Sequence, residues 1–296
     1  MPPEPSIARV PETGAHVIVD NGGTGVVRTS SGRFLRLVSP PPGLLEVLGG
    51  ASNGDGDAAA YAEALRARMS AREEEEAQQR WPGPRRGVAL VGGGPLVDAV
   101  ADALTGWGVA VSRHTDGGSL LAAMDGAADD RRGDTGTAGS RGGGVRPWGL
   151  VVAYADSPAE RLGWDRLDAL PNRGVAWLRA YREGENCFVD PICLDGDDPG
   201  SEQVYRRRLA ASFVPRELDA WRHAAAAAAP PSAAAHVLMT GRLLTLALAW
   251  AQGSEALGSY RGTLWKLVPA TGTISEHPVL AYDPPPPVDR GARRRT

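Results

Sequence analysis

The chain has 296 residues, of which 42% are apolar, and a formal net charge of −3. This length allows about two domains with cores of their own, and the near-neutral charge offers no basic surface of the kind that binds nucleic acid. The longest apolar run, at 243–251, is too short to span a bilayer, and the N-terminus has no secretory pattern. We therefore expect a folded cytoplasmic protein with no membrane segment.

Residues 1–80 predict a small unit in which strands precede helices. Three short β-branched runs within 16–38 are separated by "NGG" and "SSG", a pattern typical of a three-stranded meander. A short helix is expected over 44–50, and a long helix, capped by Asp57, up to residue 80. This order predicts a winged-helix-like unit. The run "EEEE" at 73–76 is interpreted as a solvated face of the long helix rather than a metal site.

Residues 81–283 predict a second domain that opens with alternating strands and helices. The expected elements are strand 87–92, helix 95–106, strand 108–113, helix 118–127 and strand 148–154. Such alternation favours a parallel sheet with helices packed on it. Between the last two elements, a glycine-rich stretch at about 129–146 is typical of a flexible insertion.

The remainder of the second domain predicts both helices and hairpins. The expected elements are a helix from Ser157 to about 174, a hairpin around "EGEN", helices at 201–213 and 216–229, a buried helix between Ser232 and Gly253, and a hairpin around "PATG". Residues 284–296 are expected to form a disordered tail. The predicted fold class is therefore α/β, or α+β overall, with a winged-helix-like unit followed by a degraded Rossmann-like domain.

The turn after the first strand of the second domain has part of a phosphate-binding pattern. Gly92 and Gly94 supply the first two glycines, but Val97 stands where the third is needed for close packing of helix and strand. Asp116 is the best available acidic residue for a ribose. The pattern favours glycines that serve only the turn. An ATP-dependent adenylating or NAD(P)-binding enzyme that uses Gly92, Gly94 and Asp116 remains the alternative.

Groups that commonly carry catalysis are scarce. The only lysine is Lys266, so a Walker lysine and a core Schiff-base lysine are missing. No serine lies in a nucleophile elbow, and the five histidines are dispersed. Cys187 and Cys193 have no metal-ligand partners at suitable spacing. The sequence therefore predicts no catalytic site, metal or cofactor, and hence no enzyme.

Three stretches carry a resemblance to a known family: "VALVGGGPLVDAVADALTGWGV", "GVAWLRAYREGENCFVDP" and "GTLWKLVPATGTISEHPVL". Their order resembles that of the ThiF-like leader-peptide-binding partner proteins, which accompany YcaO-type cyclodehydratases in the biosynthesis of azoline-containing ribosomal peptides. The resemblance covers most of residues 16–280. Many relatives carry C-x-x-C after the second stretch, whereas "DGDDPGSEQVYRRR" contains no cysteine. The resemblance thus implies a non-catalytic member without zinc.

The resemblance implies that a precursor's leader segment adds a strand to the first unit beside its long helix. The expected peptide-binding residues are Arg33, Phe34, Leu35, Arg36 and Leu37 on the third strand, with Tyr61, Leu65 and Met69 on one helix stripe. The implied partners are the leader peptide and a YcaO-type cyclodehydratase. An assembly subunit that binds only the partner enzyme is a further alternative, and the oligomeric state is left open, with a homodimer among the options.

Overall fold

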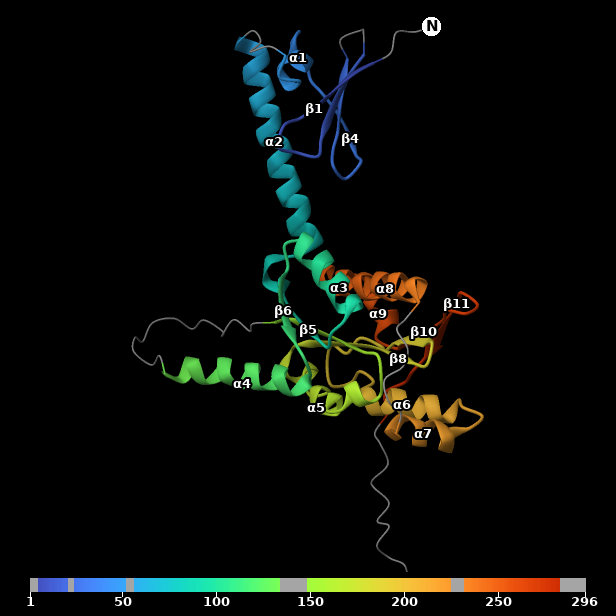
Figure 1. Ribbon diagram of the computed structural model, residues 1–296. Coiled ribbons are helices and arrows are strands. Elements are labelled where there is room, and N and C mark those ends of the chain that lie inside the picture. The colour runs from blue at the N-terminus through green and yellow to red at the C-terminus, as the bar shows by residue number, and fades with distance from the viewer. Residues whose placement is uncertain (1–4, 21–23, 52–55, 134–147, 225–231, 283–296) are drawn as a thin grey trace, which may run out of the picture. The chain divides into compact units, whose positions relative to one another are not determined.

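The computed structural model describes residues 5–20, 24–51, 56–133, 148–224 and 232–282. The chain divides into two compact units, Met1–Arg80 and Trp81–Thr296 (Figure 1). Both units combine strands with helices, which confirms the predicted mixed class of α and β structure. The predicted tail at 284–296 lies outside the described residues.

The first unit is built on a four-stranded antiparallel sheet in the order β1-β2-β3-β4. Its strands are β1 (Ser6–Arg9), β2 (His16–Val19), β3 (Gly25–Arg28) and β4 (Phe34–Arg36). The prediction of three strands was therefore incomplete, because it missed β1. Within β1 only Ile7 is β-branched, and the strand is ordered by its pairing with β2, in which Ala8 lies opposite Val17.

Two helices cover one face of this sheet, α1 (Leu44–Leu48) and α2 (Gly56–Arg80). The long helix begins and ends where the sequence predicts. Its buried residues recur every three or four positions, which is the spacing of a single helical stripe: Ala58, Ala62, Leu65 and Met69. Ala62, Leu65 and Met69 pack against Val17, Val27 and Leu37 of the sheet region, so the small core lies between sheet and helices.

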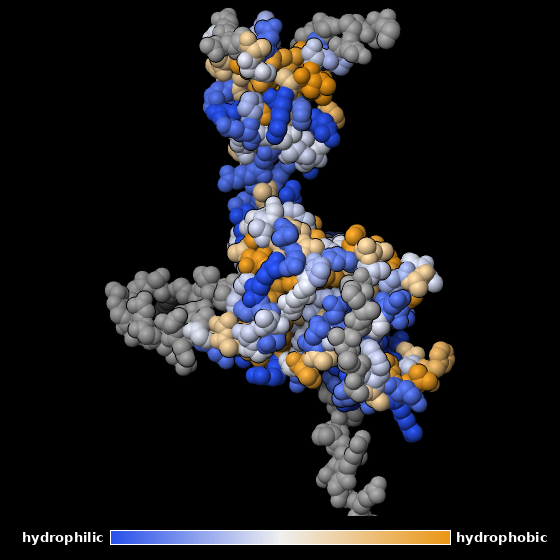
Figure 2. All heavy atoms as spheres, viewed as in Figure 1, coloured by the Kyte–Doolittle hydropathy of each residue, from blue (hydrophilic) through white to orange (hydrophobic). Residues whose placement is uncertain are grey.

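The second half of α2 is covered by hydrophilic side chains (Figure 2). Two members of its acidic run contact the sheet rather than solvent alone. The carboxylate of Glu73 accepts a hydrogen bond from the backbone N–H of Gly14 at 2.9 Å, and that of Glu76 accepts one from the hydroxyl of Ser31 at 3.1 Å. Both hydrogen bonds lie on the surface, and in addition to forming an exposed helical face these two residues tie two strand-connecting loops to the helix.

The second unit contains a seven-stranded mixed sheet in the order β11-β10-β9-β8-β7-β5-β6. Its strands are β5 (Gly87–Val91), β6 (Ala110–His114), β7 (Leu150–Ala155), β8 (Ala176–Glu183), β9 (Asn186–Val189), β10 (Thr263–Val268) and β11 (Thr273–Pro278). Strands β6, β5, β7 and β8 run parallel, as the alternation of strands and helices predicts. The two predicted hairpins form the antiparallel half of the sheet.

Helices cover both faces of this sheet (Figure 1). One face carries α3 (Pro95–Gly106), α8 (Ala233–Gln252) and α9 (Leu257–Tyr260), and the other carries α4 (Gly117–Gly133), α5 (Trp164–Leu167), α6 (Ser201–Ala210) and α7 (Pro215–Ala224). Strand residues alternate between the two cores, as for Val88 and Leu90 on one side and Ala89 and Val91 on the other. This alternation explains why β5 and β7 are almost continuously apolar.

Two predicted segments of this unit differ from the structure. The helix expected from Ser157 to residue 174 is instead a set of short turns, because Gly163 adopts a left-handed φ of 86° that interrupts any helix. Helix α4 runs on to Gly133, so the predicted insertion at 129–146 begins later than expected. Residues 134–147 lie outside the described part of the chain.

Helix α8 is the one described helix that is long and apolar enough to cross a membrane by length and composition. Its buried side chains, among them Met239, Leu243 and Leu246, pack in a core shared with α3 and the sheet. Val237 and Leu238 on the same helix are exposed. Packing against the sheet accounts for the apolar character of the buried side.

Candidate functional site

Strand β4, one of the two edge strands of the first sheet, lies beside a groove on α2. A cavity of about 270 Å³ is lined by the end of β4, by the residues that follow it and by one face of the helix. The lining residues are Arg36, Leu37, Val38, Tyr61, Ala64, Leu65 and Arg68. The hydroxyl of Tyr61 donates a hydrogen bond to the carbonyl oxygen of Val38 at 3.1 Å, which joins the helix to the end of the strand.

Strand β4 offers unpaired main-chain groups along this groove. Its only neighbour in the described sheet is β3, with Leu35 opposite Val27. The main-chain hydrogen bonds to β3 are made by alternate residues, as shown by Leu37 N–H to Gly25 and by Thr29 N–H to Arg33. In an antiparallel pair the intervening residues turn their N–H and C=O groups the other way. The N–H and C=O groups of Phe34 and Arg36 therefore face the open edge.

The eight residues predicted for peptide binding separate into two sets. Arg36, Leu37, Tyr61 and Leu65 line the groove. The other four do not line it: Met69 is buried in the core, Leu35 is half-buried against that core, and Arg33 and Phe34 are exposed, Phe34 by 62%. The alternation along the strand predicts that one of its two faces meets the helix, either that of Phe34 and Arg36 or that of Leu35 and Leu37. In the structure the face that packs in the core with α2 is that of Leu35 and Leu37.

Three groove residues were missed by the sequence prediction: Val38, Ala64 and Arg68. Two of them could have been found, because Ala64 and Arg68 lie three and seven residues after Tyr61 and so share its helical face. Arg68 and Arg36 have no ion pair among the described residues. Arg66 on the same helix is paired with Glu12 and Glu63, by contrast.

The glycine turn after β5 is needed by the fold itself. Gly92 has a φ of 107°, and a Cβ atom there would lie 2.3 Å from the carbonyl oxygen of Tyr154 at the end of β7. Its N–H donates to the carbonyl of His114 at 2.9 Å. Gly94, with a φ of 90°, provides the first carbonyl acceptor of α3. These contacts within the chain account for both glycines without a ligand.

We expect the variant Gly92→Ala to lose more than about 2 kcal/mol of stability, because the added Cβ combines an unfavourable φ with a backbone clash. Gly93→Ala is the matched control, since a Cβ there meets nothing within 4 Å and its φ is not positive. Urea unfolding of both variants measures the difference. Equal stability of the two variants would contradict this explanation of the turn.

Asp116, the alternative ribose-binding residue, caps helix α4. Its carboxylate accepts a hydrogen bond from the backbone N–H of Ser119 at 2.8 Å, and its carbonyl accepts one from the Ser119 hydroxyl. The hydrogen bond from the Ser119 N–H, assisted by the hydroxyl of Thr115, lowers the pKa of the Asp116 carboxyl. Capping is a sufficient local reason for an aspartate at this position.

Asp156 also lies at the carboxyl end of the parallel strands and was missed by the sequence prediction. Its carboxylate accepts hydrogen bonds from the hydroxyl of Tyr154 at 2.7 Å and from Arg182 at 2.8 Å. Burial, followed by the hydrogen bond to Asp156, raises the pKa of Tyr154 above its usual range. One oxygen of the carboxylate is therefore engaged by two side chains of the chain itself.

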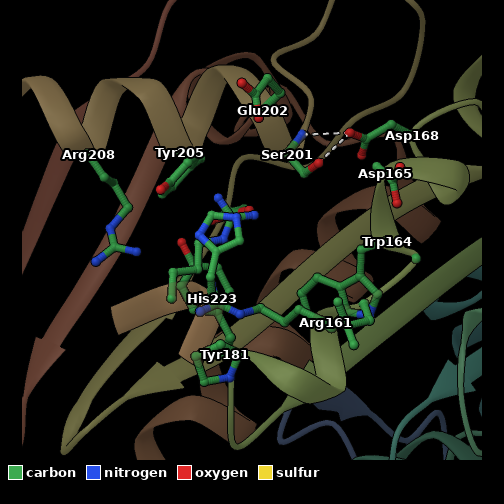
Figure 3. Close-up of a pocket in the computed structure, with 15 residues that line it drawn as sticks. Arg161, Trp164, Asp165, Asp168, Tyr181, Ser201, Glu202, Tyr205, Arg208 and His223 are labelled. Atoms are coloured by element: carbon green, nitrogen blue, oxygen red, sulfur yellow. Dashed lines mark hydrogen bonds between the residues drawn. The ribbon is translucent and has the colours of Figure 1, made fainter. Parts of the chain in front are cut away.

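A second cavity, of about 230 Å³, lies among α5, α6 and α7 (Figure 3). Its charged side chains are largely paired with one another. Asp168 accepts hydrogen bonds from the N–H of Ser201 at 2.9 Å and from its hydroxyl at 2.6 Å. Arg161 and Arg208 both bind Glu183. These contacts identify an internal ionic network that holds the helices to the sheet.

The described residues form neither a metal-binding cluster nor a reactive cysteine. No cluster of three or more His, Cys, Asp or Glu side chains suited to a metal ion occurs among the described residues. Cys187 and Cys193 are both buried and free, and burial raises the pKa of each thiol to about 11. Because the thiolate is the nucleophilic form, both thiols are poorly reactive at neutral pH.

We therefore expect neither cysteine to react with iodoacetamide at about pH 8 in the folded protein, since this lies well below the raised pKa of both thiols. Both should be labelled once urea unfolds the chain. Mass spectrometry of the alkylated protein checks this. Labelling of either residue in the folded state at the rate of a free thiol would show that the buried environment opens.

Comparisons with known proteins were made for the whole chain. No protein-family model and no curated protein sequence matches it. Among solved structures, similar chains include a heterocyclase in complex with substrate and cofactor, with 13% identity and a TM-score of 0.48, covering 93% of this chain and 38% of the other. The heterocyclase TruD has 13% identity and a TM-score of 0.44, covering 94% and 42%.

A third similar structure is the E. coli microcin synthetase McbBCD complex with pro-MccB17 bound, with 10% identity and a TM-score of 0.46, covering 94% of this chain and 97% of the other. The chain thus spans about two fifths of the length of the two heterocyclases and nearly all of the microcin synthetase chain. The structural neighbours of this protein include heterocyclase and microcin synthetase chains at low sequence identity.

Proposed function

We propose that the chain is a non-catalytic scaffold that binds the leader segment of a ribosomally made precursor peptide and presents the precursor to a YcaO-type cyclodehydratase. In this proposal the unit Met1–Arg80 is a winged-helix-like recognition unit. The unit Trp81–Thr296 is a degraded Rossmann-like scaffold of the ThiF type. Bond making and breaking take place on the partner enzyme.

The observation that carries the proposal is the free edge of β4 beside the α2 groove. An extended peptide can satisfy the outward N–H and C=O groups of Phe34 and Arg36 as a fifth strand. The same peptide would lie along the cavity that contains Leu37 and Leu65. Main-chain pairing supplies affinity for many sequences, and the cavity supplies preference among them.

Binding alone is sufficient for such a role. A leader held on this chain keeps the attached core segment near the partner's active site, at an effective concentration in the millimolar range for a short flexible link. The local contacts of Gly92, Asp116 and Asp156 support the absence of chemistry on this chain, since each group is engaged within the fold. A scaffold of this kind needs no cofactor.

A fluorescence-anisotropy titration with synthetic leader peptides encoded beside this chain tests the proposal. We expect saturable binding at tens of micromolar or tighter, and none for a scrambled leader. N-methylation of successive peptide residues should weaken binding at alternate positions only, because every second N–H points at β4 in an added strand. Absence of binding, with the partner enzyme also present, would contradict the proposal.

Delivery of the peptide is tested separately from binding. In a reaction that contains this chain, the precursor and the cyclodehydratase, an excess of free leader should slow ring formation by competing for the groove. An unchanged rate would favour the alternative in which the chain only assembles with the enzyme. Mass loss from the precursor, which reports dehydration, measures the rate.

A further inference from the structure

We propose that the segment recognised by the α2 groove alternates apolar and acidic side chains, with the apolar residues facing the helix and the acidic ones beside the arginines. This inference rests on the proposed peptide binding and specifies its chemistry. It is carried by the direction of the side chains on β4 and by two arginines that have no ion-pair partner among the described residues, Arg36 and Arg68.

The apolar half follows from the register of an added strand. Side chains of directly opposed residues in paired strands lie on the same face of the sheet. Peptide residues opposite Leu35 and Leu37 therefore point toward α2, as those two leucines do. There they meet a cavity of about 270 Å³ in which Ala64 presents only a methyl group. A side chain of the size of leucine can enter this space.

The acidic half follows from the charges around the groove. Arg36 and Arg68 line the cavity, and none of the described residues that line it is acidic. Neither arginine is ion-paired within the described residues, whereas Arg66 and Arg72 on the same helix are bound by glutamates. A peptide residue opposite Arg36 lies on the face that carries the Arg36 side chain, where a carboxylate forms a cross-strand pair.

The apolar and acidic requirements together predict that apolar residues recur at every second position of the peptide. Leucine-like residues at positions i and i+2 fill the helix side, and an acidic residue at i+1 lies beside Arg36. Arg68 lies on α2, so a carboxylate reaches it from a helix-side position at the end of the stretch, where a glutamate takes the place of a leucine-like residue. Lysine at the acidic positions would lie beside the arginines and be repelled by them. This repulsion disfavours basic peptides, just as pairing with the arginines favours acidic ones.

Two short synthetic peptides test this inference without knowledge of the native leader. In one, leucine and glutamate alternate, and in the other lysine replaces each glutamate. We expect the intact chain to bind the glutamate peptide at least about tenfold more tightly at low salt, with the preference shrinking as NaCl is raised, because screening weakens exposed pairs. Equal binding of the two peptides, or binding of neither, would overturn the inference.

Charge-reversal variants of the protein test whether the preference for the glutamate peptide arises at the groove. Arg36→Glu and Arg68→Glu should each reduce the preference for the glutamate peptide by about two- to fivefold, and the double variant should favour the lysine peptide. Arg80→Glu is the matched control, because Arg80 is exposed on the same helix outside the cavity. An effect of Arg80→Glu equal to that of Arg68→Glu would show a general charge effect and refute the assignment.

A parallel titration with the native leader keeps the two proposals distinguishable. Native leader that binds while the designed peptides show no charge preference leaves the proposed function intact and refutes the inference. The reverse result, with designed peptides discriminated and no native leader bound, refutes the proposed function and supports the alternating recognition chemistry.

Discussion

Replacing Arg179 by methionine is expected to lower the free energy of unfolding by about 3–5 kcal/mol, because it breaks a buried ionic network and leaves a carboxylate without its partner. Arg179 is fully buried on β8 and binds Asp168 at 2.7 Å and Asp190 at 2.9 Å. Asp168 keeps hydrogen bonds from Trp177 and Ser201 when the arginine is removed. Among the described residues, the buried Asp190 then keeps the hydrogen bond from the Tyr181 hydroxyl, and its Oδ1 has no partner.

The loss of unfolding free energy in Arg179→Met should become smaller as pH falls. Burial raises the pKa of the Asp190 carboxyl, and Arg179 opposes that rise. In Arg179→Met the pKa of Asp190 in the folded state rises further above its unfolded value, so the penalty is largest above the folded-state pKa. The penalty shrinks as pH falls through that pKa and is lost below about pH 4, where the carboxyl becomes protonated in both states.

Urea unfolding at several pH values measures this effect. Arg206→Met is the control, since Arg206 contacts Glu202 on an exposed helix surface and its removal should leave the stability nearly unchanged. The double variant with Arg179→Met and Asp190→Leu should recover much of the loss, because an apolar pair of similar volume removes the orphaned charge. A double variant less stable than Arg179→Met alone would contradict this account.

Replacing Arg36 by proline is expected to weaken leader binding by at least about tenfold while leaving the melting temperature nearly unchanged. The Arg36 N–H faces the open edge of β4, so proline removes a donor that the folded sheet does not use. The added strand, however, loses that hydrogen bond and meets the proline ring. Anisotropy and thermal unfolding measure the two quantities.

Arg36→Ala separates the main-chain contribution from that of the guanidinium. It keeps the N–H, so its affinity should fall by only about two- to fivefold. An equal loss for the alanine and proline variants would mean that only the side chain matters, and strand addition at this edge would be refuted. A large fall in the melting temperature of Arg36→Pro would show that the N–H is used within the fold.

Elements with strong local signals were predicted well from the sequence. Helix α8 begins after Ser232, whose side chain accepts the N–H of Ala235, and ends at Gly253 with a φ of 64°. Such caps involve residues three or four positions apart, so they can be recognised in the sequence. The same holds for the long helix α2 and for the parallel strands, whose apolar runs mark burial on both faces.

Elements without such local signals could not be predicted from the sequence, because contacts with residues distant in the chain determine their structure. Strand β1 has one β-branched residue, Ile7, and is held by its register with β2. The segment 157–174 has helix-forming composition, but Gly163 and the tryptophan packing of Trp164 against Trp177 favour short turns. Tertiary packing overrides local propensity where the propensity is weak.

The sequence by itself determined which side chains alternate along β4 and which share a stripe on α2, because both follow from the period of a single element. It identified Leu37, Tyr61 and Leu65 by that route. Only the tertiary structure decided that β4 has one neighbour in the described sheet, that the helix face of Tyr61 lies along the end of β4, and that Met69 is enclosed in the core. An open edge is a property of how strands are ordered in a sheet, and no single stretch of the chain encodes that order.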